Sequence, residues 1–479
     1  MEIIKRHLDE IFDLFLQVGI TNRFDTIYQV TCLLYLKSLE DIENVKGRDY
    51  LYMDSVFAGH EQYKWSFLVQ MDPQKCHVLF TKKIIPFLGQ QPLGIRIDSS
   101  HFLSQSVASD LIFYRILISI DKMFYEALGG KEMSKKTIGL YEEIYECLLS
   151  YLVKSIPKTK MLFAPKYLRR LVCELAQLRV PDTVFDPAMG IGNLLMDANY
   201  TLLVKASHKY NLTFDADDFP ALVNFAESAL SEDLNEDFCL EGEERDFELR
   251  FLCQMNFYFH FANLKQPQFY NGFQSDTLKT QYFQKIVSVL PIHKHTADII
   301  DMAVDKLLPN GLAVMIVPMS FLYNSTPRQQ NLRSKLLQKF RVEAVVGLPE
   351  HEFEPQAVVN TAILVVRNCP SNVHDKIWFC DLHNDGYSND RKRNKNAYNP
   401  LPILIDNFLR KDEEHNDWFD SKLIAISEVL ENNASLLVAQ YVDTYDEPVE
   451  NMDLDVIIEH LDYFQGKIKE GINELRRYL

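Results

Sequence analysis

Apolar residues recur mainly at helical spacing over the first 150 positions of the chain. The stretches 20–40 and 110–128 show this spacing most clearly. Such spacing places one apolar face on a helix, which then packs against other helices. We therefore expect a helical N-terminal domain over 1–155. In the first stretch the positions that carry this expectation are Ile27, Val30, Leu33, Leu34, Leu36 and Leu39.

Beyond about residue 157, short apolar runs alternate with helical stretches. Pro165 is expected to open a helix, because its fixed φ suits a first helical turn. Near-continuous apolar strands between helices are typical of a mostly parallel sheet that helices cover on both faces. The predicted fold class is therefore α/β, with this domain over 156–410. The expected strands are 183–185, 312–317, 342–348 and 361–366, and the expected helices include 297–308 and 332–340.

The last segment, 456–479, is charged and has apolar residues at helical spacing. This pattern predicts an amphipathic helix, which either packs on its own domain or binds a partner. We assign 411–479 to a helical C-terminal extension.

The most informative string is VFDPAMGIGNLL, residues 184–195. The expected strand delivers Asp186 to the carboxyl edge of the sheet, where open α/β folds bind their ligands. Gly190 and Gly192 allow a tight turn and a close approach of backbone to a ligand. The helix that follows points its positive N-terminus at an anionic group. A G-x-G pair alone is weak evidence, and its place between a strand and a helix strengthens it.

Four motifs resemble those of DNA adenine methyltransferases, in the same order. Asp-Pro-Ala-x-Gly-x-Gly at 186–192 resembles their S-adenosylmethionine loop, and 161–165 (MLFAP) resembles their Phe-Tyr-Thr-Pro element with alanine for threonine. Gly242-Glu243-Glu244 resembles Gly-x-Glu, and 275–278 (SDTL) resembles Gly-Asp-Thr-Leu. The resemblance implies that Glu244 binds the ribose and Asp276 the adenine of S-adenosylmethionine. The implied cofactor-binding residues are Phe163, Pro165, Asp186, Pro187, Ala188, Gly190, Gly192, Glu244 and Asp276.

The remaining similarities point to one branch of this family. The strings at 307–311 (LLPNG), 345–349 (VVGLP) and 360–365 (NTAILV) resemble the modification (M) subunit of type I restriction-modification systems, as does 29–37 (QVTCLLYLK). The resemblance implies a Rossmann-like S-adenosylmethionine-dependent methyltransferase domain. It also implies a hetero-oligomer in which a specificity-type subunit, or another defence protein, brings the chain to DNA.

The expected catalytic motif departs from the family. In the family, Asn-Pro-Pro-Phe holds the amine of a flipped adenine and stacks on the base. The aligned residues here are Val289, Leu290, Pro291 and Ile292. Valine offers no acceptor and isoleucine no ring, so loss of these contacts is expected to slow methylation by orders of magnitude. A second string, NPLP at 399–402, lies in a loop beyond the last expected strand and is not expected to replace the motif.

Three functions follow from this reading. The first is a catalytically impaired homologue that binds the cofactor or serves a structural role in a DNA restriction or defence complex. The second is an active DNA adenine methyltransferase with a divergent catalytic loop. The third is an assembly module whose cofactor site is vestigial.

The negative net charge of the chain opposes direct binding to DNA. The formal net charge is −17, whereas proteins that bind nucleic acid tightly usually present basic surfaces. A partner or a local basic face must therefore supply the attraction. The string RKRNK at 391–395, flanked by Tyr387 and Tyr398, is either such a phosphate contact or a solvated surface loop.

The remaining composition excludes other classes. The eight cysteines include no C-x-x-C pair, and His293 and His295 lack further ligands at suitable spacing, so no metal is expected. The N-terminus carries acids among its apolar residues, unlike a signal peptide. No apolar run reaches the roughly 20 residues of a membrane helix, so we expect a soluble, cytoplasmic protein without a membrane partner.

Overall fold

The computed structural model describes most of the chain outside a few segments. The described residues are 2–46, 55–90, 97–98, 102–104, 106–130, 135–153, 155–156, 161–208, 212, 239–261, 267–270, 276–354, 356–369, 375–388, 393–396 and 398–442. The amphipathic segment expected at 456–479 lies outside them.

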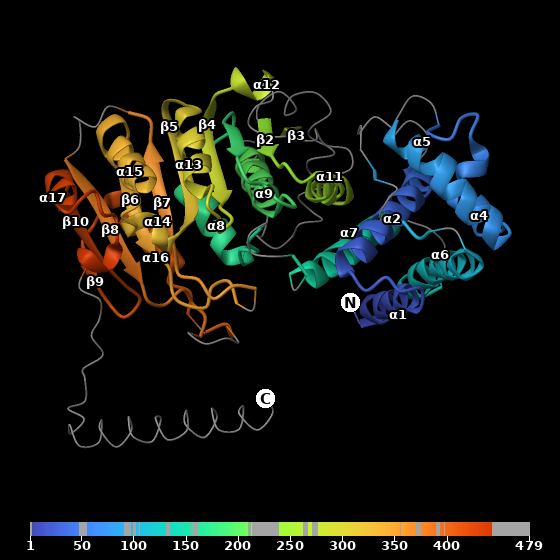
Figure 1. Ribbon diagram of the computed structural model, residues 1–479. Coiled ribbons are helices and arrows are strands. Elements are labelled where there is room, and N and C mark those ends of the chain that lie inside the picture. The colour runs from blue at the N-terminus through green and yellow to red at the C-terminus, as the bar shows by residue number, and fades with distance from the viewer. Residues whose placement is uncertain are drawn as a thin grey trace, which may run out of the picture.

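The N-terminal part is helical, as its apolar spacing predicts (Figure 1). Its long helices pack pairwise, α1 on α6 and α2 on α7. Ser106 caps α6, since its hydroxyl accepts the Ser109 amide at 3.1 Å. The elements are α1 (Glu2–Gln17), α2 (Arg23–Lys46), η2 (Glu61–Tyr63), α3 (Trp65–Leu68), α4 (Pro73–Leu79), η3 (Phe80–Ile84), α5 (Ile85–Gly89), α6 (Val107–Ala127) and α7 (Lys135–Leu152).

The second part is built on one ten-stranded sheet in the order β3-β2-β1-β4-β5-β7-β6-β8-β10-β9. Neighbours from β3 to β5 are parallel, and the pairings of β7, β9 and β10 are antiparallel. The α/β class is confirmed, with a mixed rather than uniformly parallel sheet. The strands are β1 (Thr183–Asp186), β2 (Cys239–Glu243), β3 (Gln268–Tyr270), β4 (Phe283–Val289), β5 (Leu307–Pro318), β6 (Arg341–Gly347), β7 (Thr361–Arg367), β8 (Lys376–Leu382), β9 (Glu414–His415) and β10 (Phe419–Ala425).

Helices cover both faces of the sheet, because alternate strand residues point to opposite sides. Val184 lies in one apolar core and its neighbour Phe185 in the other. The first core is closed by α8 (Lys166–Leu175), α9 (Asn193–Ser207) and α16 (Leu401–Arg410). The second is closed by α13 (Thr296–Asp305), α14 (Met319–Tyr323), α15 (Pro327–Lys339) and α17 (Ile426–Glu431), with η7 (Val438–Gln440).

One helix, α11 (Phe247–Phe261), joins the helical part to the sheet (Figure 1). Its Tyr258 ring meets the Tyr35 ring edge-on at 5.0 Å, and the Tyr145 hydroxyl donates to its Leu252 carbonyl at 2.7 Å. On its other side, Cys253 and Phe257 belong to the core beneath α9. The same short helix therefore packs into both cores.

Two boundaries differ from the expectation. The helix expected at 297–308 ends at Asp305, and Pro309-Asn310-Gly311 lies inside β5, where the register with β4 is irregular. Asn310 takes a φ of 63°, which suits this irregularity. The sheet also continues past residue 410, because β9 and β10 add to the β8 edge where a helical extension was expected. The polar residues of β10 mask its strand pattern.

Candidate functional site

Three acids meet where the parallel strands β1 and β2 end. The register pairs Asp186 with Gly242, so Glu243 and Glu244 follow at the same edge. Asp186 is 1% exposed, and its Oδ1 accepts the Ser288 hydroxyl at 2.7 Å and the Ala188 amide at 2.9 Å. We call Asp186, Glu243 and Glu244 the acidic edge.

Burial sets the electrostatics of the acidic edge. It raises the pKa of Asp186 to about 7, against the opposing hydrogen bonds from Ser288 and the Ala188 amide. It raises the pKa of Glu244 to about 7 and that of Glu243 to about 8, and the charge of Glu244 adds to the shift at Glu243. A cation placed here would favour the ionised form of all three carboxyls.

Glu243 holds an unsatisfied acceptor. Its Oε1 is buried without a hydrogen bond to the described residues, and Arg245 Nε lies 3.6 Å away as an ion pair. Glu244 is better satisfied, since it accepts the Gly190 amide at 3.1 Å and the Asp246 amide at 2.8 Å. A buried carboxylate oxygen that accepts no hydrogen bond is costly, so this position suits a ligand that donates hydrogen bonds.

The glycine loop runs as predicted between β1 and α9. Gly190 and Gly192 take φ values of 55° and 79°, which only glycine adopts freely. A methyl group on Gly190 would lie 2.4 Å from Met161 Sδ, and one on Gly192 would lie 2.4 Å from Cys253 Sγ. The glycines therefore make room for neighbouring sulfur side chains, and Met161 now packs on the face of Gly190.

Asn256 of α11 fixes the exit of the loop. Its Nδ2 lies 2.9 Å from the Ile191 carbonyl and 2.9 Å from Asn193 Oδ1. The helix that joins the two cores thus also holds the start of α9.

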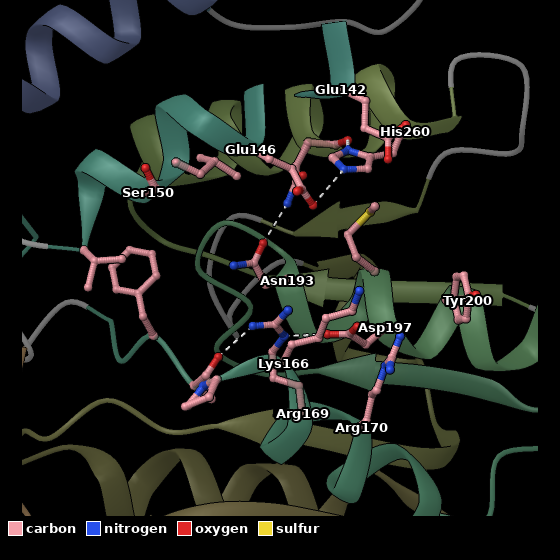
Figure 2. A pocket seen from close by; sticks show the side chains of 17 residues that line it. Glu142, Glu146, Ser150, Lys166, Arg169, Arg170, Asn193, Asp197, Tyr200 and His260 are labelled. Atoms are coloured by element: carbon pink, nitrogen blue, oxygen red, sulfur yellow. Dashed lines mark hydrogen bonds and ion pairs between the residues drawn. The ribbon is translucent and has the colours of Figure 1, made fainter. Parts of the chain in front are cut away.

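Five of the predicted cofactor residues line two different pockets, whereas Asp186, Gly190 and Gly192 line neither of the two. Pro187, Ala188 and Glu244 line a pocket of about 220 Å³ together with Pro291 and Glu243. Phe163 and Pro165 line a second pocket of about 570 Å³ between α7, α8, α9 and α11. In Figure 2, Glu142, Glu146 and His260 lie on one side of this second pocket, and Arg169 and Asp197 on the other.

Asp276 is the first residue of α12 (Asp276–Lys279), and its side chain lies outside what the structure describes. Ser275 also falls outside the described residues. The implied adenine contact therefore remains a prediction.

The position expected to be catalytic carries no polar side chain. Val289 ends β4, Leu290 is fully buried with its amide bonded to the Ile316 carbonyl at 3.0 Å, and Ile292 is half-buried. The Pro291 carbonyl accepts the Thr296 hydroxyl at 2.7 Å. Only Pro291 of these four residues lines the smaller pocket. Nothing in this stretch replaces the missing asparagine amide or aromatic ring.

The string at 399–402 does not lie beyond the last strand. Its Asn399 Oδ1 accepts the Leu401 amide at 3.1 Å, where α16 begins, and β9 and β10 follow. That expectation is wrong because the polar residues of β10 hide its strand pattern. The asparagine is used to start a helix.

Sequence reasoning missed Gln356, which fixes the segment before α8. Its Nε2 donates to the Met161 carbonyl at 2.7 Å, and its Oε1 accepts the Phe163 amide at 2.9 Å. The two segments lie far apart in the chain, so no local pattern signals this contact.

Arg393 from the basic string also has an unforeseen role. Its guanidinium bonds Asp385, Glu352 at 3.1 Å and the Tyr167 hydroxyl at 2.8 Å. Arg393 is therefore neither a solvated residue nor a phosphate contact here, because two buried carboxyls need its charge. Residues 391 and 392 lie outside the described part of the chain.

No helix among the described residues combines the length and apolar character of a membrane span.

Comparisons with known proteins agree on one family. Residues 136–300 and 266–449 match the N-6 DNA methylase family. The methylase subunit of the type I restriction enzyme MpnII of Mycoplasma pneumoniae is 23% identical over 410 residues, which cover 75% of this chain and 68% of the relative. The methylase subunit of the type I restriction enzyme MjaVIII of Methanocaldococcus jannaschii is 20% identical over 383 residues. These residues cover 73% of this chain and 61% of the relative.

Solved structures share the fold. The type I methyltransferase subunit of Streptococcus thermophilus superposes with a TM-score of 0.63 at 14% identity, covering 92% of this chain and 99% of that one. A second structure is a chain from a type I restriction-modification system, solved to explain complex assembly and conformational transition. It superposes with a TM-score of 0.61 at 18% identity, covering 98% of this chain and 96% of that one. These findings confirm the resemblance drawn from the motifs. The chain belongs to the N-6 DNA methylase family and is similar to the methylase subunits of type I restriction enzymes.

Proposed function

We propose that this chain binds S-adenosylmethionine at the acidic edge but transfers its methyl group to adenine poorly, and that it acts as a subunit of a DNA restriction or defence complex. The observation that carries the proposal is the contrast between two neighbouring strand ends. The end of β1 keeps Asp186, Gly190 and Gly192, whereas the end of β4 presents Val289 and Ile292.

The residues present fit the cofactor. Glu243 Oε1, which accepts no hydrogen bond from the described residues, and the Glu244 carboxylate offer acceptors for ribose hydroxyls. The acidic edge complements a positively charged sulfonium, and the N-cap of α9, Gly192, makes no side-chain cap hydrogen bond, which suits a carboxylate at this helix N-terminus. Met161 packs on Gly190, so its side chain must rotate for a ligand to reach the glycine backbone. The chemistry that S-adenosylmethionine supplies is an electrophilic methyl group.

The impairment follows from what methyl transfer to an adenine amine requires. The amine needs acceptors that align its nitrogen, and the flipped base needs a stacking surface. Valine and isoleucine provide neither, and the backbone carbonyl of Leu290 is the acceptor that this stretch could still offer. A lost alignment of this kind costs two to three orders of magnitude in rate or about 3–4 kcal/mol.

Assembly with a specificity-type subunit accounts for the charge. A chain with net charge −17 attracts DNA weakly, so a partner would supply both attraction and sequence reading. The chain would then work in the cytoplasm as part of a hetero-oligomer.

Calorimetry on the full chain tests cofactor binding. S-adenosylmethionine should bind the wild type, and Asp186→Ala should abolish binding because it removes the anchor of the loop. Glu10→Ala, an exposed acid on α1, is the matched control and should bind normally. Undiminished binding by Asp186→Ala would refute the placement of the site. Absence of binding by the wild type would favour the vestigial assembly module instead.

A methyl-transfer assay on DNA with a specificity-type subunit tests the impairment. We expect turnover far below that of a subunit with the intact motif. Rapid methylation by the native chain would instead establish the active enzyme with a divergent loop.

A further inference from the structure

A groove on the outer surface of the sheet domain is unrelated to the acidic edge. It has a volume of about 610 Å³ and lies between α8, α9 and α16, with the loop after β8 as one wall. Its floor is aliphatic, and is formed by Leu171, Val204, Leu401, Pro402 and Ile405.

Basic side chains surround this floor. The cations are Lys166, Arg170, Lys205 and Lys395, and the acids are Glu174 and Asp385. Asp385 is only 2% exposed and is bonded to Arg393, so Glu174 is the exposed acid among the described lining residues. Figure 2 shows Lys166 and Arg170 one helical turn apart on α8, near Tyr200. A local excess of positive charge is unusual in a chain of net charge −17.

The wall of the groove is already in place. Tyr387 stacks on Tyr167 with ring centroids 4.3 Å apart, and Arg393 ties Tyr167 to Glu352 and Asp385. A ligand would therefore meet a formed site and would not have to order this loop.

An aliphatic floor with a cationic rim fits an amphipathic acidic peptide, whose apolar residues lie on the floor and whose carboxylates face the rim. The chain itself contains such a segment. Residues 443–464 hold eight Asp and Glu and no Lys or Arg, together with apolar residues that include Leu454, Ile457, Ile458, Leu461 and Phe464.

The described chain ends at residue 442, on the face of the sheet opposite the groove. Its last residues follow η7, which contacts β6 and β8, and β8 leads directly into the loop that forms the wall. A segment of ten residues reaches about 33 Å when extended, whereas stacked layers lie about 10 Å apart, so the segment is long enough to pass around the sheet to the groove. A tethered segment also has an effective concentration of about millimolar, so even weak docking would be populated.

We propose that residues 443–464 of this chain bind in the groove between α8, α9 and α16. The acids pair with Lys166, Arg170, Lys205 and Lys395, and the apolar residues cover the aliphatic floor. The tail would thus neutralise the basic surface of its own subunit until a competing anionic partner displaces it. This inference does not depend on cofactor binding or on methyl transfer.

Zero-length carbodiimide cross-linking of the full-length monomer tests the proposal, because it joins only amines and carboxyls in direct contact. Mass spectrometry should find Lys166, Lys205 or Lys395 joined to acids of 443–462. Ile405→Glu places a charge on the floor and should lower these cross-links about tenfold, which corresponds to 1.4 kcal/mol. Amide exchange over 443–464 should accelerate in the same variant.

Arg410→Glu is the matched control, since it lies on α16 but outside the groove, and it should change nothing. Lys395→Glu should weaken the cross-links from Lys166 and Lys205, and adding Asp453→Lys should restore them. Circular dichroism checks that each variant folds.

Three results would overturn the proposal. The first is unchanged cross-linking in Ile405→Glu. The second is found when isotope-labelled and unlabelled protein are mixed and every cross-link joins a labelled to an unlabelled chain. The groove would then bind the tail of a second copy of the chain. The third is binding of a single-stranded oligonucleotide that is lost in Ile405→Glu but leaves amide exchange over 443–464 unchanged. This result would make the groove a nucleic-acid site.

Discussion

The Ser288 hydroxyl donates a 2.7 Å hydrogen bond to Oδ1 of Asp186, across the parallel pair β4 and β1. Ser288 directly precedes Val289, the first residue of the stretch that aligns with the catalytic motif of the family. The acid at the start of the glycine loop is therefore held by β4, the strand whose end aligns with the catalytic motif of the family. This support is present although Val289 and Ile292 stand where the family motif has an asparagine and an aromatic residue.

Removing that support should weaken cofactor binding without unfolding the domain. In Ser288→Ala, Asp186 keeps only the Ala188 amide, so its pKa should rise further and less of it should be ionised near neutral pH. We expect a loss of about fivefold to tenfold in affinity for S-adenosylmethionine by calorimetry. Ser435→Ala, a buried serine near η7, is the control and should bind as the wild type does. Equal affinity in both variants would contradict the role of Ser288.

Asp186 should also make stability depend on pH. Its pKa is raised from 3.8 in the unfolded chain to about 7, so the folded state binds the extra proton between these values. The free energy of unfolding should therefore fall as pH rises from about 4 to 7, because ionisation of a buried carboxyl is penalised. Asp186→Asn removes this penalty and should be more stable than the wild type at pH 8 by about 1–3 kcal/mol, with little gain at pH 4.5. Urea denaturation at the two pH values measures this difference, and an equal effect at both would show that the carboxyl does not titrate as described.

Met161 is expected to oppose ligand entry. Its Sδ occupies the space beside Gly190, so Met161→Ala should expose the glycine backbone and tighten S-adenosylmethionine binding. The same change should lower the free energy of unfolding by about 2–3 kcal/mol, because Met161 is buried. Met123→Ala in the helical core should cost as much stability with no change in affinity. Weaker binding in Met161→Ala would show that the methionine supports the site.

Two substitutions should restore part of the catalytic position. Val289→Asn returns an amide acceptor and Ile292→Phe returns a ring, so the double variant should methylate DNA at least about tenfold faster than the wild type. Leu290 is left unchanged because proline there would remove the amide that bonds the Ile316 carbonyl. Ile292→Phe alone is the control and should gain little. No gain in the double variant would mean that the pocket has changed beyond these residues.

The sequence predicts the strands and loop whose signals are local. The runs that became β6 and β7 are mostly apolar, and the DPAMGIG string carries its own turn. The strand β10, FDSKLIA, mixes polar and apolar residues, because it takes its place from pairing with β8 rather than from its own pattern. This is why the sheet was expected to end too early.

The candidate site also combines residues that have a local sequence signal with contacts that only the folded chain creates. Asp186 and the two glycines were identified from their spacing, and all three lie where expected on β1 and its loop. The bonds of Gln356 to the Met161 and Phe163 backbone join positions nearly 200 residues apart. Contacts of this kind depend on the assembled fold, so a single sequence offers no signal for them.

The position of α11 has a consequence for how the molecule unfolds. Its Tyr258 belongs to the helical core, its Cys253 lies behind Gly192, and its Asn256 holds the start of α9. Loosening of the N-terminal helices would strip one side of α11 and release the loop that faces the acidic edge. The helical part and the sheet domain should therefore unfold in one cooperative transition. Destabilising substitutions in the N-terminal helices should also lower the affinity for the ligand.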